Sequence, residues 1–462
     1  MHCFSVFMNP SADSAASPQP SSAQGAYGAF FKNKAERKAF EKQVEALRHA
    51  VLGGSEREWA AAFGPLRGHP LLPDILSNVS FGGAPLLALA ADIGFAAAVQ
   101  SLINAGAHPD APGPRGMTAL MLACDHGNLE CARFLAPVST LSAKKERPGA
   151  DHAASALHFA AAEGRADIIP VVATEDGGRL RMTRGMTPLM AAAAPFEVAS
   201  KCNWSGHVET ARALLPFSDA FARMDESDPA RGGHTALMVA LDEDRSWGPL
   251  HETLLAGMIE QEKKATRPGD ADRGGWRERH LVDICLFRGE EQELAAKALM
   301  DAGADPLARA LSTSRLPAEH QAFWIALHTH LVSTAALMAQ ALEKQNRYPR
   351  EERQAFFLEA VNHAIAGGAF DMVDVLAPFC DLTGAQLRDG VETRKRWSHS
   401  DGFLTQWTAR WEALQLLAAT QGHENADALI SRAPRSAALA AHSAATRSDV
   451  APGDAKTPSR RL

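Results

Sequence analysis

Residues 116–137 read Gly-Met-Thr-Ala-Leu-Met-Leu-Ala-Cys-Asp-His-Gly-Asn-Leu-Glu-Cys-Ala-Arg-Phe-Leu-Ala-Pro. Thr118 can cap a helix through its hydroxyl, and Leu120 begins an apolar face at helical spacing. Gly127 can adopt the left-handed conformation that ends a helix, and Pro137 cannot continue a second one. The stretch therefore predicts two short helices joined by a tight turn.

This pattern returns along the chain. Its first half recurs at 84–90, 155–160, 185–192 and 233–240, and its second half at 206–217 and 368–379. One leucine holds the equivalent place in each unit: Leu86, Leu120, Leu157, Leu189, Leu237 and Leu281. The spacings between these leucines are 34, 37, 32, 48 and 44 residues, so the last two intervals require insertions.

The repeated unit resembles the ankyrin repeat, which has a Thr-Pro-Leu-His signature and a period of about 33 residues. Residues 187–190, Thr-Pro-Leu-Met, and 155–158, Ser-Ala-Leu-His, carry the nearest matches. Residues 105–109 and 302–306 match the family's Gly-Ala-Asp turn. The resemblance implies an all-α, ankyrin-like repeat solenoid. Each repeat would be a helix-turn-helix unit with a hairpin finger, and helical caps would close the N- and C-terminal ends.

The composition of each segment and the residues that begin or end helices predict how the chain is organised. A Ser-, Ala- and Pro-rich start cannot bury enough surface to offset its ordering entropy, and Ser55-Glu-Arg-Glu58 is typical of a capping box that opens a helix. We divide the chain into a disordered leader at 1–28, an N-terminal helical cap at 29–78, six ankyrin-like repeats at 79–310, degenerate helical repeats at 311–384, C-terminal capping helices at 385–432 and a disordered tail at 433–462.

Bulk properties narrow the function class. The formal net charge of −7 argues against nucleic-acid binding, which needs a basic face. No apolar run reaches the ~18 residues of a membrane span, so we expect no membrane insertion. The six cysteines form no Cys-x-x-Cys pair, which favours a reducing, cytoplasmic setting. A bacterial effector that is exported through its Ser-rich leader and binds a host protein is the alternative.

Motifs of catalysis are missing from the sequence. It has no phosphate-binding glycine loop, no Gly-x-Ser-x-Gly elbow and no His-Glu-x-x-His, so we predict no catalytic, cofactor-binding or metal-binding residues. His328 and His330 cannot share one helix face, which argues against metal ligation by that pair. The family resemblance implies that His158 bonds to backbone between repeats. An enzyme with its site in the irregular region 311–432 stays open as a rival.

Two features predict a binding surface for a protein partner of a monomeric chain. Insertions at 195–205 and 242–249 each carry a tryptophan, and the fingers between repeats carry arginines, which favour interface hot spots. Per-repeat insertions often lie on the binding face. The candidate residues are Arg179, Arg181, Arg184, Trp204, Arg223, Asp225, Arg231 and Trp247. In the competing interpretation, each tryptophan anchors its own loop and the arginines form an ordinary solvated surface.

Overall fold

The computed structural model describes residues 34–69, 72, 76, 84–113, 116–142, 154–174, 176–194, 204–225, 231–243, 247–264, 275–286, 293–311, 319–367 and 369–379. Contacts divide the chain into two compact units, Met1–Arg273 and Gly274–Leu462. The boundary falls within the 79–310 block of the sequence analysis. The leader at 1–28, the capping helices at 385–432 and the tail at 433–462 lie outside the described residues.

The first unit is built from paired helices. It opens with α1 (Lys34–Gly53), α2 (Glu56–Phe63) and the 3-10 turn η3 (Gly64–Leu66). The pairs that follow are α4 (Leu86–Asp92) with α5 (Ala96–Asn104), α6 (Ala119–His126) with α7 (Leu129–Leu135), α8 (Ala156–Ala162) with α9 (Ile169–Val172), α10 (Pro188–Ala193) with α11 (Trp204–Leu214), and α12 (Ala236–Glu243) with α13 (Pro249–Lys264).

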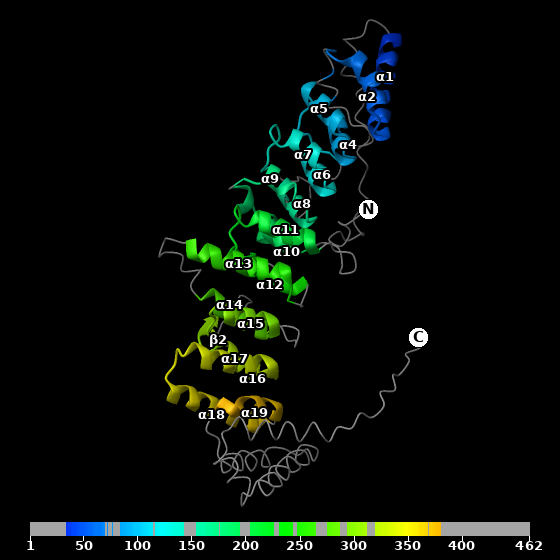
Figure 1. Cartoon of the computed structure of the whole chain (residues 1–462). Coiled ribbons are helices and arrows are strands. Elements are labelled where there is room, and N and C mark those ends of the chain that lie inside the picture. Colours follow the sequence, from blue (N-terminus) through cyan, green and yellow to red (C-terminus); the bar gives the residue numbers. More distant parts are fainter. Residues whose placement is uncertain are drawn as a thin grey trace, which may run out of the picture. The chain divides into compact units, whose positions relative to one another are not determined.

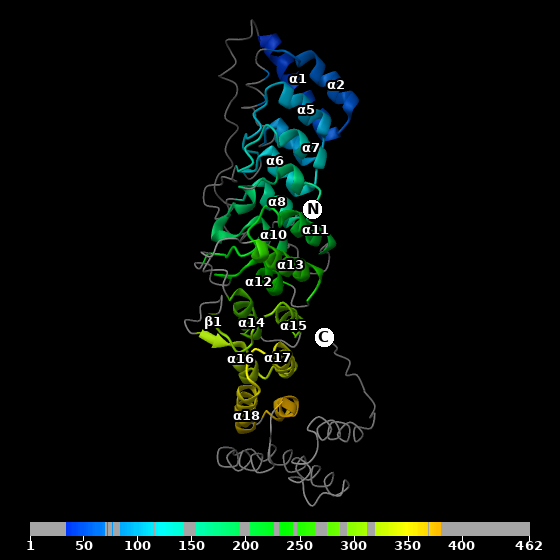
Figure 2. The same ribbon diagram turned by 60° about the vertical axis from the view of Figure 1, so that its left-hand side comes forward.

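These pairs stack in two rows. The first helices α4, α6, α8, α10 and α12 pack one on the next, and so do the second helices α5, α7, α9, α11 and α13 (Figure 1 and Figure 2). The six equivalent leucines are all buried, with at most 2 % of their surface exposed. The predicted all-α ankyrin-like fold is confirmed, because each pair buries its apolar faces against its neighbours.

The predicted helix boundaries of the repeat hold at the atomic level. The hydroxyls of Thr118 and Thr187 each accept a hydrogen bond from the backbone N–H three residues later, at 3.3 Å. Gly127 adopts a left-handed conformation, with φ of 78°, directly after α6. The Ser55 hydroxyl likewise accepts from the Glu58 N–H at 3.4 Å and opens α2. Each of these bonds satisfies one of the unpaired donors in the first turn of a helix.

Polar side chains tie one repeat to the next. The amide of Asn128 donates to the carbonyls of Ala91 and Asp92, at 2.7 and 3.1 Å, at the end of the preceding first helix. His158 lies 3.2 Å through Nε2 from the carbonyl of Met186 in the following repeat. This inter-repeat contact confirms the structural role expected for His158.

The third repeat has a second helix of only one turn. The repeat pattern predicts a full second helix in each unit, but α9 covers four residues and has Pro170 in its first turn. Proline lacks the N–H that a helix interior needs, and its ring clashes with the carbonyl four residues earlier. Pro170 can therefore stand only at the start of a helix, and the residues before it form turns.

The fingers differ from the expected β-hairpins. Over the described part of the connector 176–186, the backbone forms two 3-10 turns, η5 (Gly177–Arg179) and η6 (Thr183–Gly185), in place of strands. In the next finger, Met224 donates to the His234 carbonyl and accepts from the Gly233 N–H, at 2.9 and 3.1 Å. These two bonds close the finger at its base.

The second unit repeats the paired arrangement. Its helices are α14 (Trp276–Leu286), α15 (Glu293–Asp301), α16 (Ala322–His328), α17 (Val332–Gln345), α18 (Arg350–Gly367) and α19 (Phe370–Leu376), followed by the 3-10 turn η8 (Ala377–Phe379). The contacts α14 to α16 to α18 and α15 to α17 to α19 give two rows. Within the residues that the structure describes, no helix is long and apolar enough to cross a membrane.

Two details of this unit were not predicted. A short antiparallel ribbon joins β1 (Arg309–Leu311) to β2 (Glu319–Gln321) at the start of the predicted degenerate helical repeats, and α16 begins directly after it at Ala322. The α14 helix starts at Trp276, ahead of the Arg279-His280 pair that replaces Thr-Pro. The His280 Nδ1 lies 2.7 Å from the Trp276 carbonyl, inside the helix, so this repeat has no Thr-type cap at the equivalent position.

Candidate functional site

The fingers of the third and fourth repeats are bonded to each other. The Asp225 N–H donates to the Arg184 carbonyl at 2.9 Å. The Arg181 guanidinium donates to the Arg223 carbonyl at 3.0 Å and lies 3.5 Å from the Asp225 carboxylate. Backbone and side chains therefore join two segments about forty residues apart in sequence into one surface, which we call the finger surface (Arg179, Arg181, Arg184, Arg223 and Asp225).

Glycines set how closely these fingers approach. Gly185 has φ of +75°, and a Cβ atom there would lie 2.7 Å from the Asp225 backbone nitrogen. At Gly178 a Cβ would lie 2.1 Å from the Phe217 carbonyl oxygen. Both distances are shorter than real Cβ contacts, so a larger residue would push the finger away from Asp225 at Gly185 and away from the turn after α11 at Gly178.

The charges of the finger surface face solvent. Arg179 and Arg184 are exposed, and Arg223 is half-buried. The side chains of the Arg181–Asp225 pair are 48 % and 51 % exposed, so the pair contributes at most about 1 kcal/mol to stability. Its chief effect is to hold two long side chains at fixed places on the surface.

Arg231 lies in a separate, intramolecular network. Its guanidinium contacts Glu243 and lies 3.6 Å from Asp242, and its side chain is only 24 % exposed. His234, almost fully buried, lies 3.0 Å through Nδ1 from the same Asp242 carboxylate. This predicted binding residue therefore braces the base of its own finger against α12.

The two tryptophans have different places in the fold. Trp247 is half-buried and stacks on the ring of His251 in α13, with ring centroids 5.3 Å apart and an interplanar angle of 26°. This contact agrees with the interpretation that it anchors its own loop. Trp204 is the first residue of α11. That the two tryptophans lie close together stays a prediction.

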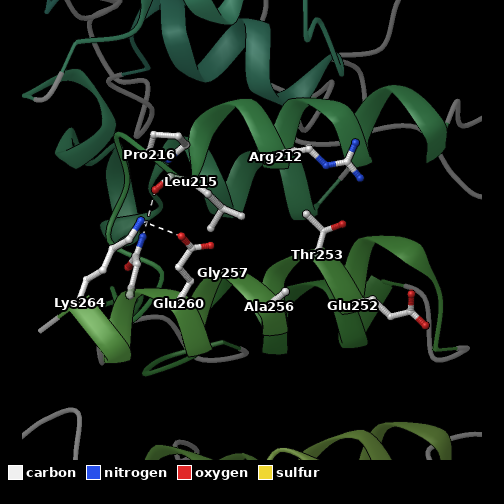
Figure 3. Close-up of a pocket in the computed structure, with 10 residues that line it drawn as sticks. Arg212, Leu215, Pro216, Glu252, Thr253, Ala256, Gly257, Glu260 and Lys264 are labelled. Carbon is white, nitrogen blue, oxygen red and sulfur yellow. Dashed lines mark hydrogen bonds and ion pairs between the residues drawn. The ribbon is translucent and has the colours of Figure 1, made fainter.

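A groove that the sequence analysis missed runs between α11 and α13 (Figure 3). It has a volume of about 450 Å³ and a floor of Leu215, Ala256 and Gly257. A Cβ at Gly257 would lie 2.4 Å from a Leu215 methyl, so glycine allows the two helices to approach closely. Arg212 and Lys264 stand on the rims of the groove. A glycine inside a helical pattern is the one sequence signal that could have located it.

The three cysteines that the structure describes, Cys124, Cys131 and Cys285, are buried. Burial raises the pKa of the Cys131 thiol to about 11 and raises the pKa of Cys124 and Cys285 further, so these thiols are inert at neutral pH. Within the part of the chain that the structure describes, no group of three or more His, Cys, Asp and Glu side chains is placed to hold a metal ion.

A comparison with known protein families agrees with the stacked helix pairs of the first unit. The family model for ankyrin repeats (3 copies) matches residues 68–148 and 86–179. A solved structure of an ankyrin repeat protein, EF0377, is 16 % identical with a TM-score of 0.35, and the alignment covers 45 % of this chain and 96 % of that chain. No curated protein matches the chain. The family model therefore identifies ankyrin repeats within residues 68–179.

Proposed function

We propose that this chain is a non-enzymatic module that binds a folded protein partner through the finger surface. The observation that carries the proposal is the bonding between neighbouring fingers, in which Asp225 donates to the Arg184 carbonyl and Arg181 to the Arg223 carbonyl. Because these bonds fix the fingers before any partner arrives, little ordering entropy is lost on association. Ankyrin repeats in general act as protein–protein interaction modules.

The residue types of the finger surface support this proposal. Arginine is enriched at interface hot spots because its planar guanidinium pairs with carboxylates and stacks on aromatic rings. Arg179 and Arg184 point into solvent from two turns of one finger, while Arg223 lies on the next finger. The protein partner would contact these three side chains, with Arg181 and Asp225 holding the fingers in register.

Two of the predicted residues take supporting roles in this proposal. Arg231 braces its finger against Asp242 and Glu243, and Trp247 stacks on His251. Replacing either residue would lower stability as well as binding, so neither is suited to a test of the interface.

Affinity capture with matched variants tests the proposal. The exposed finger arginines are replaced in Arg179→Glu/Arg223→Glu, and the control is Arg133→Glu, because Arg133 is an exposed arginine on α7, outside the finger surface. Partners held by the wild type and by Arg133→Glu should be lost from the finger variant, while the melting temperatures of all three proteins agree within about 2 °C. Equal capture by a folded finger variant would remove the finger surface as the binding site.

A further inference from the structure

Two histidines from different repeats of the second unit meet at its surface. His328 ends α16, His363 lies in α18, and their ring centroids are 4.6 Å apart with an interplanar angle of 59°. Both side chains are exposed. The ring of Trp324, one turn before His328, lies 5.7 Å from His363 and 6.1 Å from His328. The sequence analysis weighed His328 only against its neighbour His330.

We propose that His328 and His363 form a two-imidazole site for a divalent transition-metal ion, with Cu²⁺ bound more tightly than Zn²⁺. Metal–nitrogen bonds to histidine are about 2.0–2.1 Å long, and a ring nitrogen lies about 1.2 Å from its ring centre, which places the metal about 3.2 Å from each centroid. The two centroids are 4.6 Å apart. For a metal placed in line with one nitrogen of each ring, the angle between the two nitrogen–metal bonds is then about 90°.

That angle favours one metal class over others. An angle near 90° between nitrogen ligands is typical of tetragonal Cu²⁺ or Ni²⁺ sites, whereas tetrahedral Zn²⁺ prefers a wider one. The Irving–Williams order also ranks Cu²⁺ above Zn²⁺ for nitrogen ligands. The structure offers no larger His, Cys, Asp and Glu cluster within its described residues, so water would complete the coordination.

A hydrogen bond orients one of the two ligands. Nδ1 of His328 lies at hydrogen-bond distance from the carbonyl of Trp324. A ring nitrogen that faces a carbonyl must carry the proton, which leaves the lone pair on Nε2 for a metal. Metal-binding histidines characteristically donate their other ring N–H to a carbonyl or carboxylate in this way. Glu359, one turn before His363 on α18, adds negative charge on the same helix face.

The site would link two repeats. α16 and α18 pack against each other, so a metal held by one residue from each helix binds the folded state more tightly than the unfolded chain. Binding should therefore raise the melting temperature of the full-length protein in proportion to metal occupancy. A two-ligand surface site also predicts modest affinity and loss of binding at acid pH, because both imidazoles must be neutral to ligate.

Metal titration of the full-length chain tests the site. CuCl₂ and ZnCl₂ are titrated calorimetrically into the wild type, His328→Gln, His363→Gln and the control His330→Asn. The control replaces an exposed histidine at φ of 60° by asparagine, which tolerates that conformation. Either site variant should bind one equivalent of Cu²⁺ fewer than the wild type, and the control should bind as many as the wild type. Equal stoichiometry in all four proteins would overturn the proposal.

A spectroscopic measurement covers the case in which a variant folds poorly. The electron paramagnetic resonance spectrum of the wild type with one equivalent of Cu²⁺ should show two equatorial nitrogen ligands. A spectrum with only oxygen ligands, or with one nitrogen, would refute the two-imidazole site without any mutant. A rise in melting temperature with Cu²⁺ in the wild type that persists in His363→Gln would refute the link between α16 and α18.

Discussion

Alanine substitutions at two finger glycines, with Gly54 between α1 and α2 as the control, separate backbone strain from steric clash. Gly54 has φ of +62°, and a Cβ atom at this position would have no other atom within 4 Å. Gly54→Ala therefore introduces backbone strain without a steric clash. Gly178→Ala places a Cβ 2.1 Å from the Phe217 carbonyl oxygen, without a left-handed φ. Gly185→Ala combines both effects, because φ is +75° and the Cβ lies 2.7 Å from the Asp225 backbone nitrogen.

The expected costs follow from these distances. A left-handed L-residue costs about 1–2 kcal/mol. Overpacking against a fixed backbone costs about 1–3 kcal/mol. At Gly185 the displaced Asp225 N–H also loses its bond to the Arg184 carbonyl, worth about 0.5–1.5 kcal/mol. We therefore expect a destabilisation of about 1–2 kcal/mol for Gly54→Ala and about 3–5 kcal/mol for Gly185→Ala, with Gly178→Ala between them.

Urea denaturation followed by circular dichroism measures these differences. The midpoints should shift in the order Gly54→Ala, Gly178→Ala, Gly185→Ala while the denaturant dependence of the unfolding free energy stays constant. Amide hydrogen exchange adds a local readout, because the Asp225 N–H should lose protection in Gly185→Ala and keep it in Gly54→Ala. A Gly185→Ala protein as stable as Gly54→Ala would refute the close approach of the two fingers.

Three further predictions concern buried or partly buried side chains of the two units. Gln261→Ala should lower stability by about 2–3 kcal/mol in urea denaturation, because the Gln261 amide bonds to the carbonyls of Leu215 and Ser218 and to the Ala220 N–H; a change below about 0.5 kcal/mol would contradict these bonds. Burial, aided by Arg165, lowers the pKa of His207. The unfolded chain therefore binds more protons than the folded one below about pH 6.5, and stability should fall as the pH is lowered from about 7.5 to 5.5, less steeply in His207→Asn; parallel pH profiles would contradict this. Cys124, Cys131 and Cys285 should resist iodoacetamide at about pH 8 in the native protein and react in urea, as mapped by peptide mass spectrometry, because burial raises the pKa of each thiol; native labelling at the denatured rate would refute their burial.

Much of the repeat core could be predicted because local and global signals agree. Leu120 was placed on an apolar helical face, and it is buried between α6 and its neighbours. Thr118 and Gly127 mark the first helix at both ends, as their side chain and φ value show. The burial and the helix ends at such positions depend on interactions within one repeat, so they can be predicted from the sequence of that repeat alone.

The structure departs from the repeat pattern at two places, one where a proline shortens a helix and one where two short strands pair. Pro170 restricts α9 to one turn although the apolar spacing favours a longer helix. Residues 309–311 and 319–321 pair as two short strands. Backbone hydrogen bonds between the two segments determine this structure, and the sequence there has no glycine that would mark a helix end. Hydrophobic periodicity alone does not distinguish short apolar helices from short strands.

The binding surface could be predicted only in part, because sequence does not show which charges are satisfied internally. Arg181 and Arg231 look alike as finger arginines. The structure gives Arg181 an exposed place across two fingers, whereas Arg231 lies against Asp242 and Glu243. The partners of Arg231 lie eleven and twelve residues further on, across the start of α12, so only the folded geometry identifies them.

Side chains that bond between repeats reach residues about one repeat away in sequence, and this spacing also explains the contact between His328 and His363. Asn128 bonds to a carbonyl 37 residues earlier, Arg165 to one 40 residues earlier and Gln345 to one 41 residues earlier, each about one repeat away. His328 and His363 are also one repeat apart, so the helix stack itself brings their rings together. The sequence would predict this contact if the regular spacing of the equivalent leucines continued beyond Leu281. Residues 316–345 lack the glycines that mark the repeat register, so the sequence gives His328 no partner one repeat away.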